Sequence, residues 1–445
     1  MKFRLAIVLL GLSLATRAQQ PAPPKVLSFS AGQAVEYAMS HSVTVKNALL
    51  DIEYQRQSNK VVTAEALPQL SGNAGLTDYL SIPTTLIPAE FFNGPPGTFI
   101  PVKFGTKYIG NYGATLDQIL FDGQVFVGLM ARKKSIDFMQ TTAEVTQDNI
   151  KANVYKIYYQ LVVAKRQIGT LSANISNLEL LLHDTREIYK NGFAEKLDVD
   201  KVQVQLTNLQ TQKLRAENQV AAGLQGLKFL MNVPMKDSLV LTDTLSDEQI
   251  KSNILDQAYN YQDRKEYQLL GIEEDLQKLN IKRYQLSKLP TLRLTANISK
   301  SAQRSTFNFF KGGLPYYTTS FLGLSLNVPI FSGGAKNAQI REAKIDLQKT
   351  ENNIEQMQAS IDNQVSQARI TMTSAILTMD AQKKNTDLAE KVYQSTRLKY
   401  EQGVGSNQEI STAEADLVTA QNNYYSAIYD AIIAKIDYLQ ATGKL

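Results

Sequence analysis

The chain contains no cysteine, and its only histidines are His41 and His183. The lack of cysteine excludes disulfides, thiolate metal sites, cysteine nucleophiles and a lipid-modified N-terminal cysteine. Two histidines are too few for a multi-histidine metal site, and no glycine-rich loop has the spacing that cradles phosphate. We therefore expect no enzyme activity, no cofactor and no metal, and we interpret both histidines as ordinary helix-surface or packing residues.

The chain also lacks a concentrated basic segment. Its formal net charge is +5, and Lys2, Arg4 and Arg17, which contribute to it, lie in a predicted leader. Phosphate backbones are bound by concentrated basic faces, and no Lys/Arg-rich run is present. The sequence therefore predicts no nucleic-acid partner.

Long apolar runs are absent as well. Residues 1–18 are typical of a secretory signal peptide, with a charged start, an apolar run from Leu5 to Leu14 and a small residue, Ala18, at the expected cleavage site. That run is about half of the roughly 20 residues that a membrane-spanning helix needs, and no later segment comes closer. We therefore expect export from the cytoplasm, and any membrane crossing must be made by strands.

Proline and glycine are missing from residues 335–402 and from residues 406–442. Such stretches are typical of uninterrupted helices. Two seams advance in alternating steps of four and three residues, the period of a coiled coil. A free coiled coil between two chains remains an alternative at this point. The seams are Ile150, Val154, Ile157, Leu161, Ala164, Ile168, Leu171, Ile175, Leu178 and Leu182, then Ile410, Ala413, Leu417, Ala420, Tyr424, Ala427, Ala431, Ala434 and Tyr438.

Four segments alternate between apolar and polar residues. We predict strands at 69–80, 108–121, 291–303 and 317–330, each close to the length of a tilted membrane strand. Aromatic residues collect at their loop ends, where an interfacial girdle would lie. Four strands cannot close a barrel, so several copies must combine; three copies are favoured and two stay possible, and a small soluble sandwich is the alternative. The loop at 80–107 contains five prolines and is longer than its counterpart at 303–316.

The chain is internally duplicated. We divide it into a first repeat at 19–232, a linker at 233–254 and a second repeat at 255–445, each repeat reading helix, strand, loop, strand, long helix, turn, helix. Two shorter helices, near 255–288 and 406–440, are expected to flank the long helix at 335–402. The matching motifs are Leu67-Pro68-Gln69-Leu70 with Leu289-Pro290-Thr291-Leu292, Leu120-Phe121-Asp122-Gly123 with Ile330-Phe331-Ser332-Gly333, and Tyr189-Lys190-Asn191-Gly192 with Tyr400-Glu401-Gln402-Gly403.

These duplicated motifs resemble the TolC family of outer-membrane efflux channels over nearly the whole chain. The resemblance implies a mainly helical fold with a membrane β-barrel, a homotrimer whose twelve strands continue into a periplasmic helical tunnel. It also implies the outer membrane of a Gram-negative bacterium, contact with outer-membrane lipid, a periplasmic adaptor, and an inner-membrane RND or ABC pump. Many relatives carry an acylated N-terminal cysteine, which this chain lacks, so we expect no lipid anchor.

The same resemblance assigns the candidate site to the two turns that end the long helices. It implies that Asp198 and Glu409 occupy acidic positions of the channel constriction, where a second acidic position holds Thr412, and that Gly405 replaces a locking arginine. Good turn chemistry and a favourable helix dipole explain the glycines and the two carboxylates equally well. The expected adaptor-contact residues are Tyr189, Gly192, Phe193 and Ala194 in the first turn, and Tyr400, Gly403, Val404 and Gly405 in the second.

The sequence therefore predicts a passive exit duct of a tripartite efflux or type I secretion system. A secreted or periplasmic coiled-coil adhesin without channel activity is the alternative, and a periplasmic enzyme is a third class. The cargo and the class of pump stay open at this stage.

Overall fold

The computed structural model describes residues 25–244, 247–252 and 258–445. The predicted leader at 1–18 lies outside the described residues. The chain divides into two compact units, each made of separate segments. Unit 1 comprises Met1–Val43, Ile150–Leu255 and Ile370–Asp437, and unit 2 comprises Thr44–Asn149, Asp256–Arg369 and Tyr438–Leu445.

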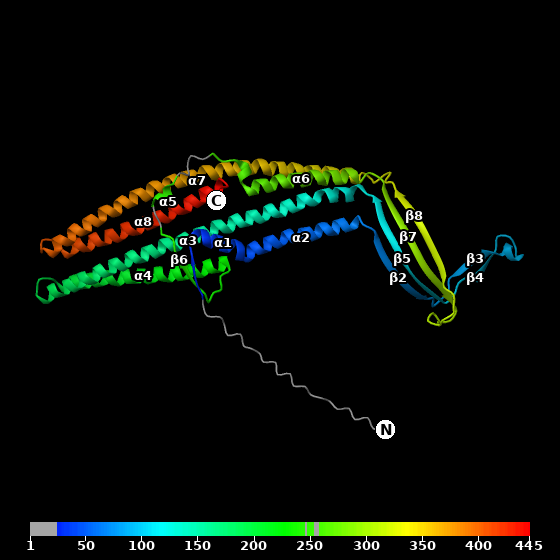
Figure 1. Cartoon of the computed structure of the whole chain (residues 1–445), viewed down its shortest axis with the longest axis horizontal. Helices are drawn as coiled ribbons and strands as arrows, with labels where there is room; N and C mark the ends of the chain where they lie inside the picture. Colours follow the sequence, from blue (N-terminus) through cyan, green and yellow to red (C-terminus); the bar gives the residue numbers. More distant parts are fainter. Residues whose placement is uncertain (1–24, 245–246, 253–257) are drawn as a thin grey trace, which may run out of the picture. The chain divides into compact units, whose positions relative to one another are not determined.

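Helices dominate the described chain (Figure 1). None of them, within the described residues, is both long and apolar enough to cross a membrane. The helices are α1 (Ala31–His41), α2 (Val43–Glu65), α3 (Gly123–Lys190), α4 (Lys196–Met231), α5 (Asp247–Lys251), α6 (Lys265–Leu286), α7 (Ala335–Glu401) and α8 (Asn407–Ala441), with 3-10 turns η1 (Ala89–Phe92) and η2 (Tyr261–Asp263). The strands are β1 (Val26–Phe29), β2 (Gln69–Asp78), β3 (Thr84–Pro88), β4 (Phe99–Lys103), β5 (Tyr108–Phe121), β6 (Ser238–Leu241), β7 (Thr291–Arg304) and β8 (Tyr317–Asn327).

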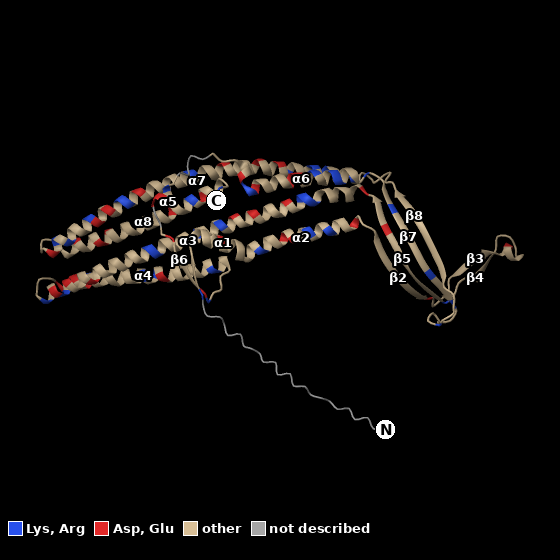
Figure 2. Ribbon diagram, viewed as in Figure 1, with Lys and Arg blue, Asp and Glu red and all other residues tan. Residues whose placement is uncertain are grey.

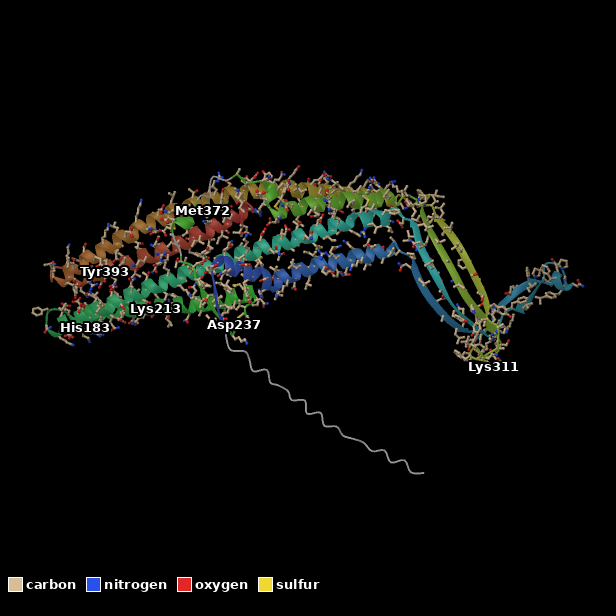
Figure 3. The ribbon with its side chains drawn as sticks, in the orientation of Figure 1. His183, Lys213, Asp237, Lys311, Met372 and Tyr393 are labelled. Carbon is tan, nitrogen blue, oxygen red and sulfur yellow. The ribbon has the colours of Figure 1, made fainter. Side chains whose placement is uncertain are left out.

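The two proline-free and glycine-free stretches form the uninterrupted helices α7 and α8. The seam of α3 is buried or half-buried along its whole length, and so is that of α8. In unit 1 these seams meet α4 and α7 in a cluster that includes Leu178, Val202 and Tyr393, each no more than 2% exposed. Figure 3 labels Tyr393 on α7. The partners of the coiled-coil seams are therefore found within one chain, and no second chain is needed to cover them.

The helix predicted near 255–288 is shorter than expected. Residues 253–257 are outside the described part, and α6 begins only at Lys265. The side chain of Asn260 caps the 3-10 turn η2, and Arg264 follows it with an extended backbone. Arg264 is 8% exposed, and its guanidinium donates to the Gln364 side chain at 3.1 Å and to the Ala441 carbonyl at 3.0 Å. These contacts with distant residues hold the chain out of the helix that local propensity favours.

The predicted linker at 233–254 contains a strand and a short helix. Strand β6 pairs in parallel with β1, from Val26 against Ser238 to Phe29 against Leu241. The buried hydroxyl of Tyr158 on α3 donates to the Phe29 carbonyl at 2.8 Å and accepts from the Asp243 amide at 3.2 Å. Residues 238–243 are therefore an ordered part of unit 1.

Unit 2 contains one antiparallel sheet in the order β2-β5-β7-β8. All four predicted strands are present; the first ends at Asp78 and the last at Asn327, earlier than expected, and the third extends to Arg304. Its register aligns Leu70, Leu116, Ala296 and Leu322 in one row, so the even-numbered apolar residues share one face. Figure 2 shows few charged residues on these strands.

The proline-rich loop between β2 and β5 has structure of its own. Its strands β3 and β4 form an antiparallel hairpin, with Leu86 opposite Pro101, that projects beyond the sheet (Figure 1). Phe91, Phe92 and Phe99 are at least 60% exposed. The prolines concealed this hairpin from sequence analysis because they lower strand propensity and remove backbone donors.

Candidate functional site at the helix hairpin tips

In unit 1, the turn between α3 and α4 and the turn between α7 and α8 have the same geometry. Gly192 and Gly403 have φ angles of 82° and 75°, as the turn chemistry predicts. In the first turn the Gly192 amide donates to the Tyr189 carbonyl at 2.9 Å, and the next amide to the Ile188 carbonyl at 3.0 Å. The second turn repeats both bonds, so both are Schellman motifs, which need a residue that tolerates positive φ.

Each turn exposes one large apolar side chain. Phe193 is 85% exposed and Val404 is 75% exposed, and each directly follows the glycine of its turn. In many Schellman motifs the residue at this position packs back on its own helix. Here both side chains are presented to the surroundings, as a contact surface requires.

The other predicted turn residues are placed differently. Tyr189 is 44% exposed, and Ala194 and Gly405 are half-buried. Tyr400 is partly buried, and its hydroxyl lies 3.2 Å from the Thr185 hydroxyl of α3. A Cβ built on Gly405 would lie 3.0 Å from the Tyr400 backbone nitrogen, so this turn has little room for a side chain there.

Asp198 joins the two hairpins. Its backbone amide and side chain complete a capping box with Glu195 at the start of α4. The side-chain amide of Asn407, the first residue of α8, donates to both the carbonyl oxygen and the carboxylate of Asp198, at 3.2 and 3.1 Å. The carboxylate therefore has two roles, as a helix cap and as an acceptor across the α4–α8 boundary.

Glu409 and Thr412 lie on the exposed side of the first turns of α8. The Glu409 amide donates to the Ser406 hydroxyl at 3.2 Å, and the Thr412 hydroxyl to the Gln408 carbonyl at 2.9 Å. The Glu409 backbone amide and the Thr412 hydroxyl are thus bonded locally, and no hydrogen bond within the described residues joins either residue to Asp198. An exposed carboxylate in the first helical turn interacts favourably with the helix dipole.

Two further polar contacts, not predicted from the sequence, join α4 and α8. Lys201 donates to the Gln408 side chain at 3.3 Å, and Gln205 donates to the Ser411 carbonyl at 3.2 Å. With the Asn407 contact they make three polar links, which we call the α4–α8 latch. Only the spacing of polar residues beside an apolar seam could have indicated it.

Glu414, three residues beyond Ser411, is a buried carboxyl that was not predicted from the sequence. It is 4% exposed, and its Oε2 atom has no hydrogen-bond partner. Burial raises the pKa of Glu414 to about 8, against a smaller opposing effect of Arg397, which is paired with Glu401 at 2.8 Å. The neutral, protonated acid is therefore favoured at neutral pH.

The pKa of Glu414 is about 8 in the folded chain and ordinarily 4.5. Between pH 4.5 and about pH 8, the folded chain therefore retains a proton on Glu414 that the unfolded chain releases. Stability must therefore fall as pH rises from about 4.5 to about 8. Glu414→Gln is uncharged throughout. We expect the variant to match wild type near pH 5 in denaturant unfolding and to exceed it near pH 9, on the order of a few kcal/mol.

The exposed Glu217, paired with Lys213 on α4, provides the control for that measurement. Glu217→Gln should retain the wild-type dependence of stability on pH. Parallel profiles for wild type and Glu414→Gln would show that the buried carboxyl does not carry the dependence.

Comparison with known proteins gives related sequences and folds. Proteases secretion protein PrtF of Dickeya chrysanthemi is 24% identical over 66% of this chain and 62% of its own length. Outer membrane protein TolC of Escherichia coli K12 is 21% identical over 74% of this chain and 68% of its own. The chain thus spans about two thirds of these relatives.

Among solved structures, CusC aligns with a TM-score of 0.77 at 16% identity, covering 96% of this chain and 95% of CusC. The predicted TolC-like fold is thereby confirmed. The model of the outer membrane efflux protein family matches residues 34–233 and 273–444, which is most of the chain. This chain therefore belongs to the outer membrane efflux protein family.

Proposed function

We propose that the chain is the outer-membrane channel of a tripartite efflux or type I secretion system, through which substrates pass passively to the exterior. The observation that carries this proposal is the sheet of unit 2, whose edge strands β2 and β8 each have one neighbour within the described chain. On its apolar face, Leu70, Leu322 and Leu324 are 68–75% exposed. An apolar face of this extent is typical of a surface that meets lipid or another protein.

The open edges support a homotrimer. In hydrocarbon, unpaired backbone groups cost several kcal/mol each, so β2 of one copy must pair with β8 of the next. Two copies would give eight strands, a barrel that side chains fill, whereas three give twelve and leave room for water. We therefore prefer three copies.

The opposite face of the sheet suits a water-filled lumen. Thr295 donates to the Asp117 carboxylate at 2.9 Å, and Asn297 donates to the Thr115 hydroxyl at 2.9 Å. Polar residues on one face and apolar residues on the other are the pattern of a membrane barrel. This sheet, together with the family, favours a channel over a coiled-coil adhesin.

For partners we propose a periplasmic adaptor and an inner-membrane pump, of either the RND or the ABC class. The exposed Phe193 and Val404 at the two tips are the surface that the adaptor would contact. PrtF is a protease secretion protein, so polypeptides are a reasonable cargo.

We expect the purified protein to conduct ions across planar bilayers, and we assign Glu409 to the periplasmic constriction. Three copies of this exposed carboxylate around one axis would attract divalent cations. Glu409→Ala should then weaken divalent-cation block of the single-channel current by about tenfold. Bilayers that stay impermeable would refute the channel, whereas unchanged block would remove only Glu409 from the constriction.

The α4–α8 latch is proposed to hold the tip closed. Asn407→Ala removes both bonds to Asp198, a loss of about 1–2 kcal/mol from the closed state. The ratio of open to closed times should rise by roughly five- to thirtyfold in single-channel recordings. Thr419→Ala is the control, since that hydroxyl bonds only within α8; an equal effect of both changes would argue against the latch.

The tip contact can be tested by adding charge to the exposed valine. Val404→Asp leaves the backbone bonds of the turn intact, but places a carboxylate where an apolar contact is proposed. Binding of the same organism's purified adaptor should weaken by at least about tenfold, while trimers persist in gel filtration. Gln402→Asp, on the same turn, is the charge-matched control, and equal affinity of both variants would exclude Val404 from the contact.

A further inference from the structure

The apolar face of the sheet changes character toward its loop end. The rows through Leu116 and Ala114 are apolar at most positions, and the row two steps further contains Tyr112 beside Lys300. Arg304 lies on the same face, opposite Tyr108, about 13 Å along β7 from Lys300. Two cations thus follow the apolar band on the face that the proposed function assigns to lipid.

An aromatic ring lies beside Arg304, and Tyr112 is the cross-strand neighbour of Lys300. The guanidinium of Arg304 lies 5.8 Å from the centre of the Tyr316 ring, and this ring packs edge to face on Tyr112 at 5.5 Å. Phe307 packs in the same manner on Tyr108 at 5.7 Å. Tyrosines and cations at the edge of an apolar band are typical of a membrane–water interface.

The cations have few acidic partners. Arg304 donates to the carbonyls of Gln303 and Pro315 at 3.1 and 2.6 Å, while its buried Nε has no acceptor. The nearby carboxylate of Asp78 lies 4.0 Å from the Lys107 ammonium. No salt bridge within the described residues involves Lys300 or Arg304, so positive charge is left on this face.

A charge on the lipid face is costly at the bilayer midplane and nearly free at the interface. The loop end of the sheet is the end away from α2, α3, α6 and α7, and is therefore the outer rim of the proposed barrel (Figure 1). An interfacial cation next to a tyrosine meets headgroups, and phosphate is the group that lysine and arginine bind there.

We propose that Lys300 and Arg304, flanked by Tyr112 and Tyr316, bind the phosphate of an anionic lipid headgroup in the outer leaflet. This proposal rests on the proposed function, because it needs the apolar face to contact lipid. The exposed ammonium of Lys300 and the guanidinium of the half-buried Arg304 would donate hydrogen bonds to the phosphate oxygens. Each cation near an anionic surface is worth roughly fivefold in affinity.

The full-length protein in detergent can be titrated with diphosphoryl lipid A, and native mass spectrometry can count the bound lipid. Lys300→Gln and Arg304→Gln should each weaken binding about fivefold, and the double variant about twentyfold. Lys300→Arg should retain wild-type affinity. Arg293→Gln is the matched control, because Arg293 lies on the same strand with its side chain on the polar face.

Several outcomes would overturn the lipid site. One is equal affinity of wild type and the double variant for lipid A, and another is an equal loss of affinity in Arg293→Gln. Equal binding of dephosphorylated lipid A would also exclude the site. Displacement of the lipid by millimolar inorganic phosphate would indicate a site for the free anion instead. Conductance of the same preparations separates the two proposals. Variants that conduct normally without lipid preference refute only the lipid site, whereas protein that never conducts refutes the channel.

Discussion

The rest of the proposed assembly depends on one constraint. The backbone amides and carbonyls along the open edges of β2 and β8 need hydrogen-bond partners. A sheet with these edges and an exposed apolar face cannot stand alone in hydrocarbon, since every amide and carbonyl there needs a partner. In the proposed trimer, pairing with further copies would satisfy these edges and enclose water along the polar face. The proposed oligomer, its lumen and the path for cargo would thus follow from the same unpaired backbone groups.

The features that sequence could predict are those fixed by local periodicity. The helices α7 and α8 follow from the lack of proline and glycine, and the four strands of the sheet from strict alternation. The late start of α6 could not be predicted, because Arg264 is held by Gln364 and Ala441, about 100 and 177 residues away. The β1–β6 pair is similarly non-local, and each of its strands is only four residues long.

Some features of the candidate site could likewise be predicted from local sequence, and others could not. Gly192 and Gly403 could be placed because a Schellman turn needs a residue that accepts positive φ. The link between Asp198 and Asn407 joins positions 209 apart in sequence, and no local pattern specifies it. In the sequence, Glu414 stands out only as a charged residue between the seam positions Ala413 and Leu417. Only the packed structure shows that it is buried.

The energetics of the tip differ from those of the seams above it. The seams are held by apolar contacts, which are non-directional and lost only by separating the helices. At the tip, Gln205, Asn407, Ser411 and Glu414 each have a buried polar atom without a partner. Such atoms cost about 1–3 kcal/mol each, so the tip is less stable than its apolar packing alone would make it. Under the gating proposed for the α4–α8 latch, a docking partner would then need to supply only a modest difference in binding energy to open the tip, while the seams keep the hairpins intact.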